Sequence, residues 1–201
     1  MDNKINKAWG NFLNPDVMRP TLISIAIYIA GFEILKDSII GRVKDFYSFI
    51  NGVKEDDGFT NPKYKSDVLS RNQNEVFACL DWLKSENVID ENDINVFSQT
   101  KAYRNDLAHR LHQLIGTEVI AIDFEKHFRE IVILLRKIET WWVINFEIPT
   151  NPDFDGKEID ESNIISGTML SLQLMCEIAL GSEEQSWSCY EEYKKVFKKS
   201  T

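Results

Sequence analysis

The sequence has few cysteines, and none of them stand close together. Cys79, Cys176 and Cys189 are widely separated in a chain of 201 residues. Zinc knuckles need paired ligands at short spacing, and disulfide frameworks are typical of short secreted chains with an even number of cysteines. The cysteines indicate neither arrangement, so we expect the reducing environment of the cytoplasm.

Positive charge is also scarce. The chain has 23 lysines and arginines against 32 aspartates and glutamates, which gives a formal net charge of −9 at pH 7. Non-specific binding to nucleic acid depends on a broad basic surface that displaces counterions from phosphates. This charge balance argues against such a surface, and any nucleic-acid site must therefore be local.

Long apolar runs are missing as well. A membrane-spanning helix needs about 20 apolar residues, whereas the apolar run here extends only from Leu22 to Phe32. Arg19 and Pro20 precede the run and Glu33 closes it, and no small-residue cleavage site is evident. We interpret this segment as a buried core helix and expect no membrane association.

The sequence shows neither the alternating pattern of strands nor an internal repeat. Apolar residues recur instead at three- and four-residue spacing, which is typical of helices. We therefore expect an all-α bundle of about five to six helices in a single domain, residues 1–201, with a loop near 51–70 and extra C-terminal helices over 162–198. The expected helices run from Asn14 to Phe49 with a break or kink near Pro20, from Asn72 to Ser85, from the acidic cap at 90–93 to Gly116, from Asp123 to about Pro149, from a cap at Ser162 to Gly181, and from a capping box at 182–185 to the basic end at 194–199.

Residues 103–112 combine a core stripe with a polar stripe on one helix. A helix advances about 100° per residue, so Leu107, Leu111 and Leu114 form an apolar stripe that faces the core. The same arithmetic places a second stripe about 200° round the helix, facing away from the core. This polar stripe consists of Asn105, His109 and His112.

These polar residues have an ordinary explanation. Two histidines and an asparagine on an outer helix face can be solvated surface residues, and Arg104 can pair with Asp106 or Glu125. A metal site at His109 and His112 is disfavoured because no carboxylate stands where it could complete the ligand set. We expect no metal and no cofactor.

Residues Arg104-Asn105-Asp106-Leu107-Ala108-His109 resemble the signature of HEPN domains, in which an arginine, usually followed by a polar residue, precedes a histidine by a few residues on one helix. The turn before this helix and the long amphipathic helix after Gly116 are also similar to the HEPN arrangement. The resemblance is specific over about Val88 to Trp142 and is architectural elsewhere. It implies a HEPN-like helical bundle.

Many HEPN proteins are metal-independent ribonucleases that dimerise, so that both motifs line one cleft. The resemblance implies a homodimeric endoribonuclease of a toxin or anti-phage defence system, with Arg104 and His109 catalytic and Asn105 in support. A histidine titrates near neutral pH and can move a proton to or from the RNA, and an arginine can bind the scissile phosphate through two hydrogen bonds. The expected products are a 2′,3′-cyclic phosphate and a 5′-hydroxyl. Further contacts to RNA are assigned to His112, Arg110 and Lys101.

Some HEPN toxins are neutralised by a partner that modifies a tyrosine two positions after the histidine, but that position here is Leu111, so control by this route is in doubt.

Two other interpretations of the function remain open. The first alternative is a non-catalytic HEPN module that binds a nucleotide, RNA or a protein partner, which the acidic net charge favours. The second is a regulatory subunit that docks through Trp141, Trp142 or Trp187.

Overall fold

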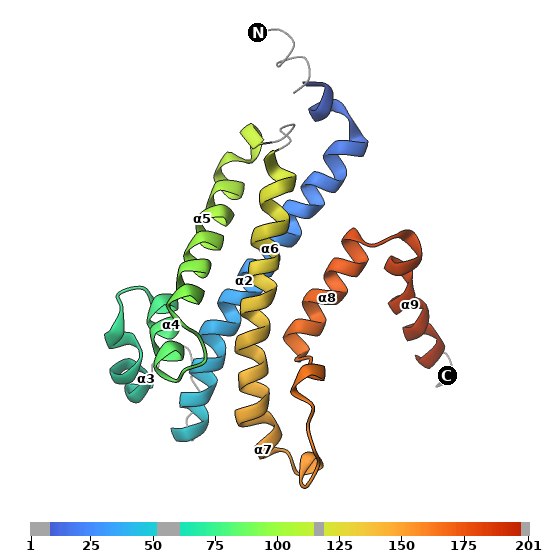
Figure 1. The fold of residues 1–201 in the computed structure, drawn as a ribbon. Helices are drawn as coiled ribbons and strands as arrows, with labels where there is room; N and C mark the ends of the chain where they lie inside the picture. The colour runs from blue at the N-terminus through green and yellow to red at the C-terminus, as the bar shows by residue number, and fades with distance from the viewer. Residues whose placement is uncertain (1–8, 52–60, 115–118, 198–201) are drawn as a thin grey trace.

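The computed structural model describes residues 9–51, 61–114 and 119–197. Within these ranges the chain is helical and contains no strand, which confirms the all-α prediction (Figure 1). The number of α-helices in these ranges exceeds the five to six predicted, because short helices form between the long ones. The α-helices are α2 (Pro15–Asn51), α3 (Pro62–Asp67), α4 (Glu75–Ser85), α5 (Glu91–Leu114), α6 (Val119–Trp142), α7 (Ile148–Thr150), α8 (Gly167–Leu180) and α9 (Glu183–Phe197). Short 3₁₀ turns occur at Leu69–Arg71, Pro152–Phe154 and Glu161–Asn163, and a π-helical turn at Val143–Glu147 follows α6.

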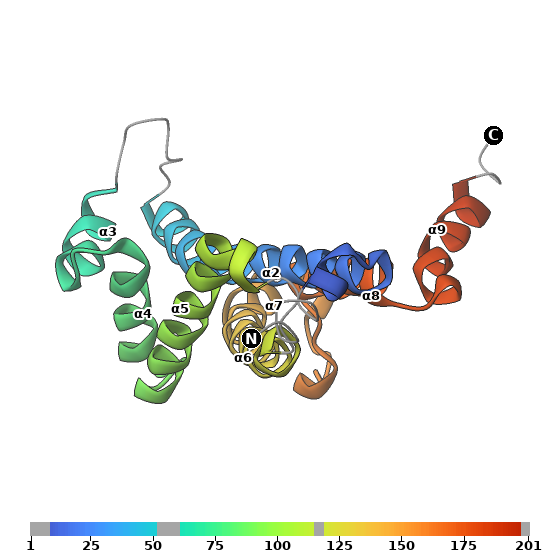
Figure 2. The ribbon, with the colours of Figure 1, turned by 90° about the horizontal axis from the view of Figure 1, so that it is seen from above.

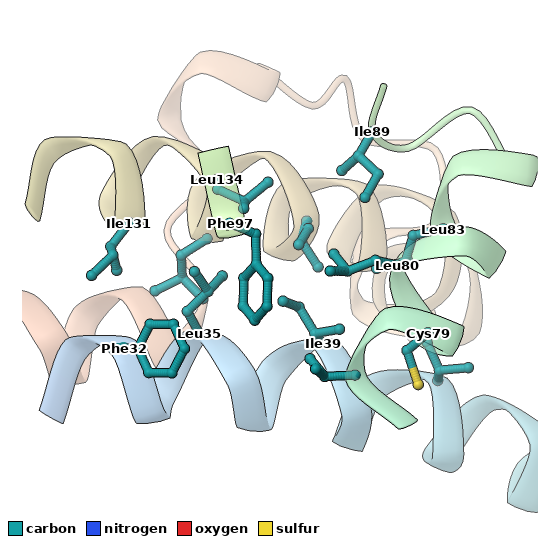
Figure 3. Close-up of a cluster of buried hydrophobic side chains, with 14 of the residues drawn as sticks. Phe32, Leu35, Ile39, Cys79, Leu80, Leu83, Ile89, Phe97, Ile131 and Leu134 are labelled. Atoms are coloured by element: carbon teal, nitrogen blue, oxygen red, sulfur yellow. The ribbon is translucent and has the colours of Figure 1, made fainter. Parts of the chain in front are cut away.

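The body of the molecule is formed by α2, α5 and α6, which pack along their lengths (Figures 1 and 2). The short α4 packs on α2, whereas α8 packs on the side of α2 and α6 away from α5. Large apolar side chains from four of these helices meet in one core (Figure 3). Examples are Leu35 from α2, Leu80 from α4, Phe97 from α5 and Ile131 from α6, each of which is fully buried.

The apolar run at 22–32 lies within α2, and its inward side is part of this core. Ile25, Tyr28 and Phe32 are buried, because residues three and four apart share one face of a helix. This burial confirms the prediction of a core helix. None of the helices in the described ranges combines the length and the apolar character needed to cross a membrane.

Two predicted helix starts are confirmed by their hydrogen bonds. Before α5, the side chains of Asp90 and Asp93 each accept a hydrogen bond from the other residue's backbone N–H, at 2.9 Å in both cases. Before α9, Ser182 and Gln185 exchange the same kind of bonds, at 2.9 and 3.3 Å. Such reciprocal capping satisfies backbone donors that have no partner inside the helix.

The predicted loop near 51–70 is wrong in its second part. Residues 62–67 form α3 and 69–71 a 3₁₀ turn, while 52–60 lie outside the described residues. Asn61 caps α3 through its side-chain oxygen, and Pro62 is the first helical residue. An asparagine followed by proline is a turn signal but also a helix-start signal. Burial of Tyr64 in the core favours the helix here.

Three other details of the helices differ from the prediction. α2 passes through Pro20 without a break. α6 begins at Val119 rather than at Asp123. α8 is capped by Ser166, whose hydroxyl accepts from the Met169 N–H at 3.1 Å, and not by Ser162, which belongs to a 3₁₀ turn. Gly181 ends α8 as predicted.

Candidate functional site

The two faces predicted for α5 are present in the described residues. Leu107 is fully buried against the core, whereas Asn105 and His109 are exposed. Asn105 and His109 are four positions apart and therefore lie one above the other on the helix surface. The side chains of Arg110, Leu111, His112 and Leu114 lie outside the described residues, so their predicted roles stay predictions.

Arg104 lies at the border between the two faces and is held from α2. Its Nη2 atom donates a 2.7 Å hydrogen bond to Oε1 of Glu33, and both side chains are about one-third exposed. Glu33 lies 71 positions earlier in the chain and is not one of the acidic residues that the sequence suggested as partners. The packing of α5 near α2 thus supplies the counter-charge of Arg104.

The electrostatics of this pair keep Glu33 ionised. The pKa of its carboxyl is lowered from its ordinary value, first by a hydrogen bond from Lys36 and also by Arg104. Arg104 directs a second nitrogen, Nη1, towards Oδ1 of Asn105 at 3.4 Å, while its Nε is buried without a hydrogen-bond partner. A guanidinium carries five N–H donors. Glu33 and Asn105 therefore engage only part of the donor set.

Lys101, one of the predicted RNA contacts, packs against α4. Its Nζ lies 4.9 Å from the centre of the Phe77 ring, a cation–π distance. This contact holds the ammonium one turn before Arg104 on α5.

His127 on α6 was missed by the sequence reading. Its Nδ1 lies 2.7 Å from Oε2 of Glu130, and its ring lies against the Tyr103 ring with centroids 4.7 Å apart. Tyr103 immediately precedes Arg104, so the His127 ring packs against the residue next to the motif. The spacing of His127 and Glu130 on a predicted helix was the signal that could have found it.

A buried acid, Glu139 on α6, also escaped the sequence reading. It is fully buried and accepts hydrogen bonds from Ser38 Oγ at 2.6 Å and from Arg42 Nη2 at 2.7 Å. Burial opposes ionisation of this carboxyl, but hydrogen bonds from Arg42, Ser38 and Ser166 outweigh it, and the pKa is lowered. Because its partners come from α2 and from the cap of α8, Glu139 joins three helices.

The described part of the chain contains no group of three or more histidine, cysteine or carboxylate side chains that could hold a metal ion. Comparison with known proteins gave no match to a family model, to a curated protein or to a solved structure. The geometry of α5 and the resemblance of its motif are thus the basis for a functional proposal.

Proposed function

We propose that this chain is a metal-independent endoribonuclease of the toxin or anti-phage defence type, with a cleft formed by α5 of two copies. One observation carries the proposal. Asn105 and His109 are exposed on one face of α5, and Arg104 is fixed by Glu33 at the edge of that face. An arginine, an amide and an imidazole within about one and a half helical turns form a suitable set for binding a phosphate and moving a proton.

The proposed reaction uses the RNA's own nucleophile. The ribose 2′-oxygen attacks phosphorus, the bond from phosphorus to the 5′-oxygen breaks, and a 2′,3′-cyclic phosphate and a 5′-hydroxyl result. The 2′-hydroxyl loses one proton and the leaving 5′-oxygen gains one, so proton transfer balances. His109 acts as the base or the acid, with an effect of about 10²–10⁴-fold. Arg104 stabilises the charge that develops on the phosphate oxygens.

A second copy completes the site in this proposal. His109 is exposed on the convex surface of a helix, where a single copy offers little enclosure to exclude water from the reacting phosphate. A two-fold axis beside α5 brings two copies of the same face together without requiring any other surface. RNA then binds between two sets of Arg104, Asn105 and His109.

The proposal is tested by incubating the purified protein with total RNA and with tRNA in EDTA. Wild type should cleave and leave 2′,3′-cyclic phosphate ends, and His109→Ala should not. Lys126→Ala, which removes an exposed cation from α6, is the matched control and should retain cleavage. Failure of wild type to cleave, or full activity of His109→Ala, would overturn the proposal.

A second candidate function is favoured by the ion pair itself. Glu33 already neutralises Arg104, and the net charge of −9 opposes RNA binding. A non-catalytic module would use the same face to bind a nucleotide, RNA or a neutralising protein partner. Binding that depends on Arg104, without any cleavage by wild type, supports this second function.

A further inference from the structure

The C-terminal helix α9 lies at the edge of the molecule farthest from α5 (Figures 1 and 2). It follows α8 and packs against it. Three large aromatic side chains occur along α9 at three-residue spacing, so they follow one another around one side of the helix. Trp187, Tyr190 and Tyr193 are 55%, 49% and 56% exposed.

These three exposed rings share one helix, whereas the other exposed rings of the described residues lie elsewhere in the chain, at Trp9, Phe12, Phe49 and Phe154. Trp142, one of the tryptophans suggested for docking, is in fact buried at 3% exposure, and Trp141 packs against the same core. Both end α6, where the aromatic cluster with Phe46 covers them. Of the three tryptophans suggested for docking, Trp187 is the one whose side chain is more than half exposed. A contiguous exposed apolar face of this kind indicates a binding surface.

The charges of the segment are separated along its length. Residues 183–192 contain four glutamates and no lysine or arginine, a charge of −4, while residues 193–199 contain four lysines and no acid, a charge of +4. This order suits the helix dipole of α9, but the dipole does not explain the exposed rings. Two such segments placed antiparallel about Tyr190 bring residues 183–187 of each, with Glu183 and Glu184, opposite residues 193–197 of the other, with Lys194 and Lys195.

We propose that the aromatic face of α9 pairs with α9 of a second copy, antiparallel about a two-fold axis near Tyr190. Trp187 of each copy then lies near Tyr193 of the other. A groove of about 420 Å³ borders the aromatic face and shares Trp187 with it; its lining also includes Lys195 and four glutamates, Glu183, Glu184, Glu191 and Glu192. Within α9, Lys194 pairs with Glu191 and Lys195 with Glu192. Glu183 and Glu184 are therefore the acidic residues that face the lysine-rich end of the second copy.

This surface is separate from the one in the proposed nuclease dimer. α5 and α9 lie on opposite sides of α6 (Figure 1), so pairing through α9 joins α5 dimers into larger assemblies. A helix of 15 residues is about 22 Å long, which gives a contact smaller than a standard interface. Association through α9 should therefore be weak and depend on concentration in the micromolar range.

The test uses complementary charge variants of the full chain. Variant A carries Lys194→Glu and Lys195→Glu, and variant B carries Glu183→Lys and Glu184→Lys. Each changes exposed positions or positions near the surface, so both should fold. Sedimentation velocity over a concentration series should show weaker self-association of A and of B than of wild type, by about 10-fold. An equimolar mixture of A and B should regain the larger species.

Controls separate α9 from other contacts between copies. Any dimer formed through α5 is common to A, B and their mixture. Only the increase in association on mixing therefore measures pairing through α9. Trp187→Ala with Tyr190→Ala should also weaken association by about 10-fold or more, while circular dichroism stays unchanged. If the mixture gains nothing over A or B alone, or if the aromatic variant associates like wild type, the pairing is wrong. Cleavage activity plays no part in this readout.

Discussion

Arg104 and Glu33 form the contact on which the residue-scale behaviour of the site depends. The carboxylate holds the guanidinium at a defined place, and it also reduces the positive charge available to a phosphate. The two effects act on different quantities. Orientation affects the rate of the chemical step, and charge affects the binding of RNA.

Replacing Glu33 should separate these two effects. Glu33→Gln keeps an oxygen that accepts from Arg104 but removes the negative charge, so KM for RNA should fall by about 2- to 5-fold. Glu33→Ala removes the anchor as well, and kcat should fall by about 10-fold or more. Steady-state kinetics on one RNA substrate measures both. Equal kinetic constants for wild type and both variants contradict a positioning role.

The two histidines of α5 should contribute unequally. His109 belongs to the motif, whereas His112 lies one turn further on. His109→Ala should reduce cleavage by about 10²-fold or more, and His112→Ala by about 10-fold or less, since it loses only a contact to phosphate or to the partner helix. Initial rates of cleavage measure the ratio. If His112→Ala is as damaging as His109→Ala, the assignment of one histidine is wrong although the nuclease activity stands.

At the scale of the element, α5 has one face for stability and another for function. Leu107→Ala should lower the free energy of unfolding by about 2–5 kcal/mol, because it leaves a cavity in the core. His109→Ala should change it by no more than about 0.5 kcal/mol. For Arg104→Ala we expect a loss of about 1 kcal/mol or less, since its ion pair is one-third exposed.

Urea denaturation of the three variants tests this division of α5. It also tests whether Arg104 and His109 stabilise the folded chain or belong to a functional site. A loss for His109→Ala comparable with that for Leu107→Ala shows a structural role for the imidazole, and the functional proposal loses its main support.

Glu139 should make the contact between α2, α6 and α8 sensitive to acid. Its carboxyl has an ordinary pKa of 4.5 in the unfolded chain and a lower pKa in the fold. The stabilisation is therefore complete above about pH 4.5 and is lost as the pH falls through the lower, folded value. Glu139→Gln should cost roughly 1–3 kcal/mol at neutral pH and should flatten the acid dependence. Thermal unfolding of both proteins between neutral and acidic pH measures the difference, and parallel curves contradict the prediction.

At the scale of the whole molecule, the proposed nuclease requires two copies of α5 side by side. Light scattering should give twice the monomer mass of 23.3 kDa for a Trp187→Ala, Tyr190→Ala variant, in which pairing through α9 is removed. Ala108 is exposed beside His109, so Ala108→Arg should break the dimer by steric and charge repulsion. Cleavage should fall with it. A monomer that cleaves RNA at full rate rules out the shared site.

Periodicity in the sequence predicted most of the helices, because a helix that buries one face must repeat its apolar residues every three or four positions. Capping residues in the sequence also predicted the helix starts at Asp90 and Ser182, because both caps are made by neighbours in the chain. The predicted helix boundaries were wrong where neighbouring residues favour two different local structures. Asn61 and Pro62 fit a turn and a helix start equally well, and the burial of Tyr64 favoured the helix.

The sequence by itself determined the helical class, the burial of Leu107 and the exposure of Asn105 and His109, because each follows from spacing along a single helix. Only the tertiary structure decided that Glu33 is the partner of Arg104, that Glu139 joins three helices, and that Trp142 is buried while Trp187 is exposed. The physical reason is the same in each case. Contacts between residues 71 or 101 positions apart depend on how helices pack against one another, and local periodicity carries no information about that packing.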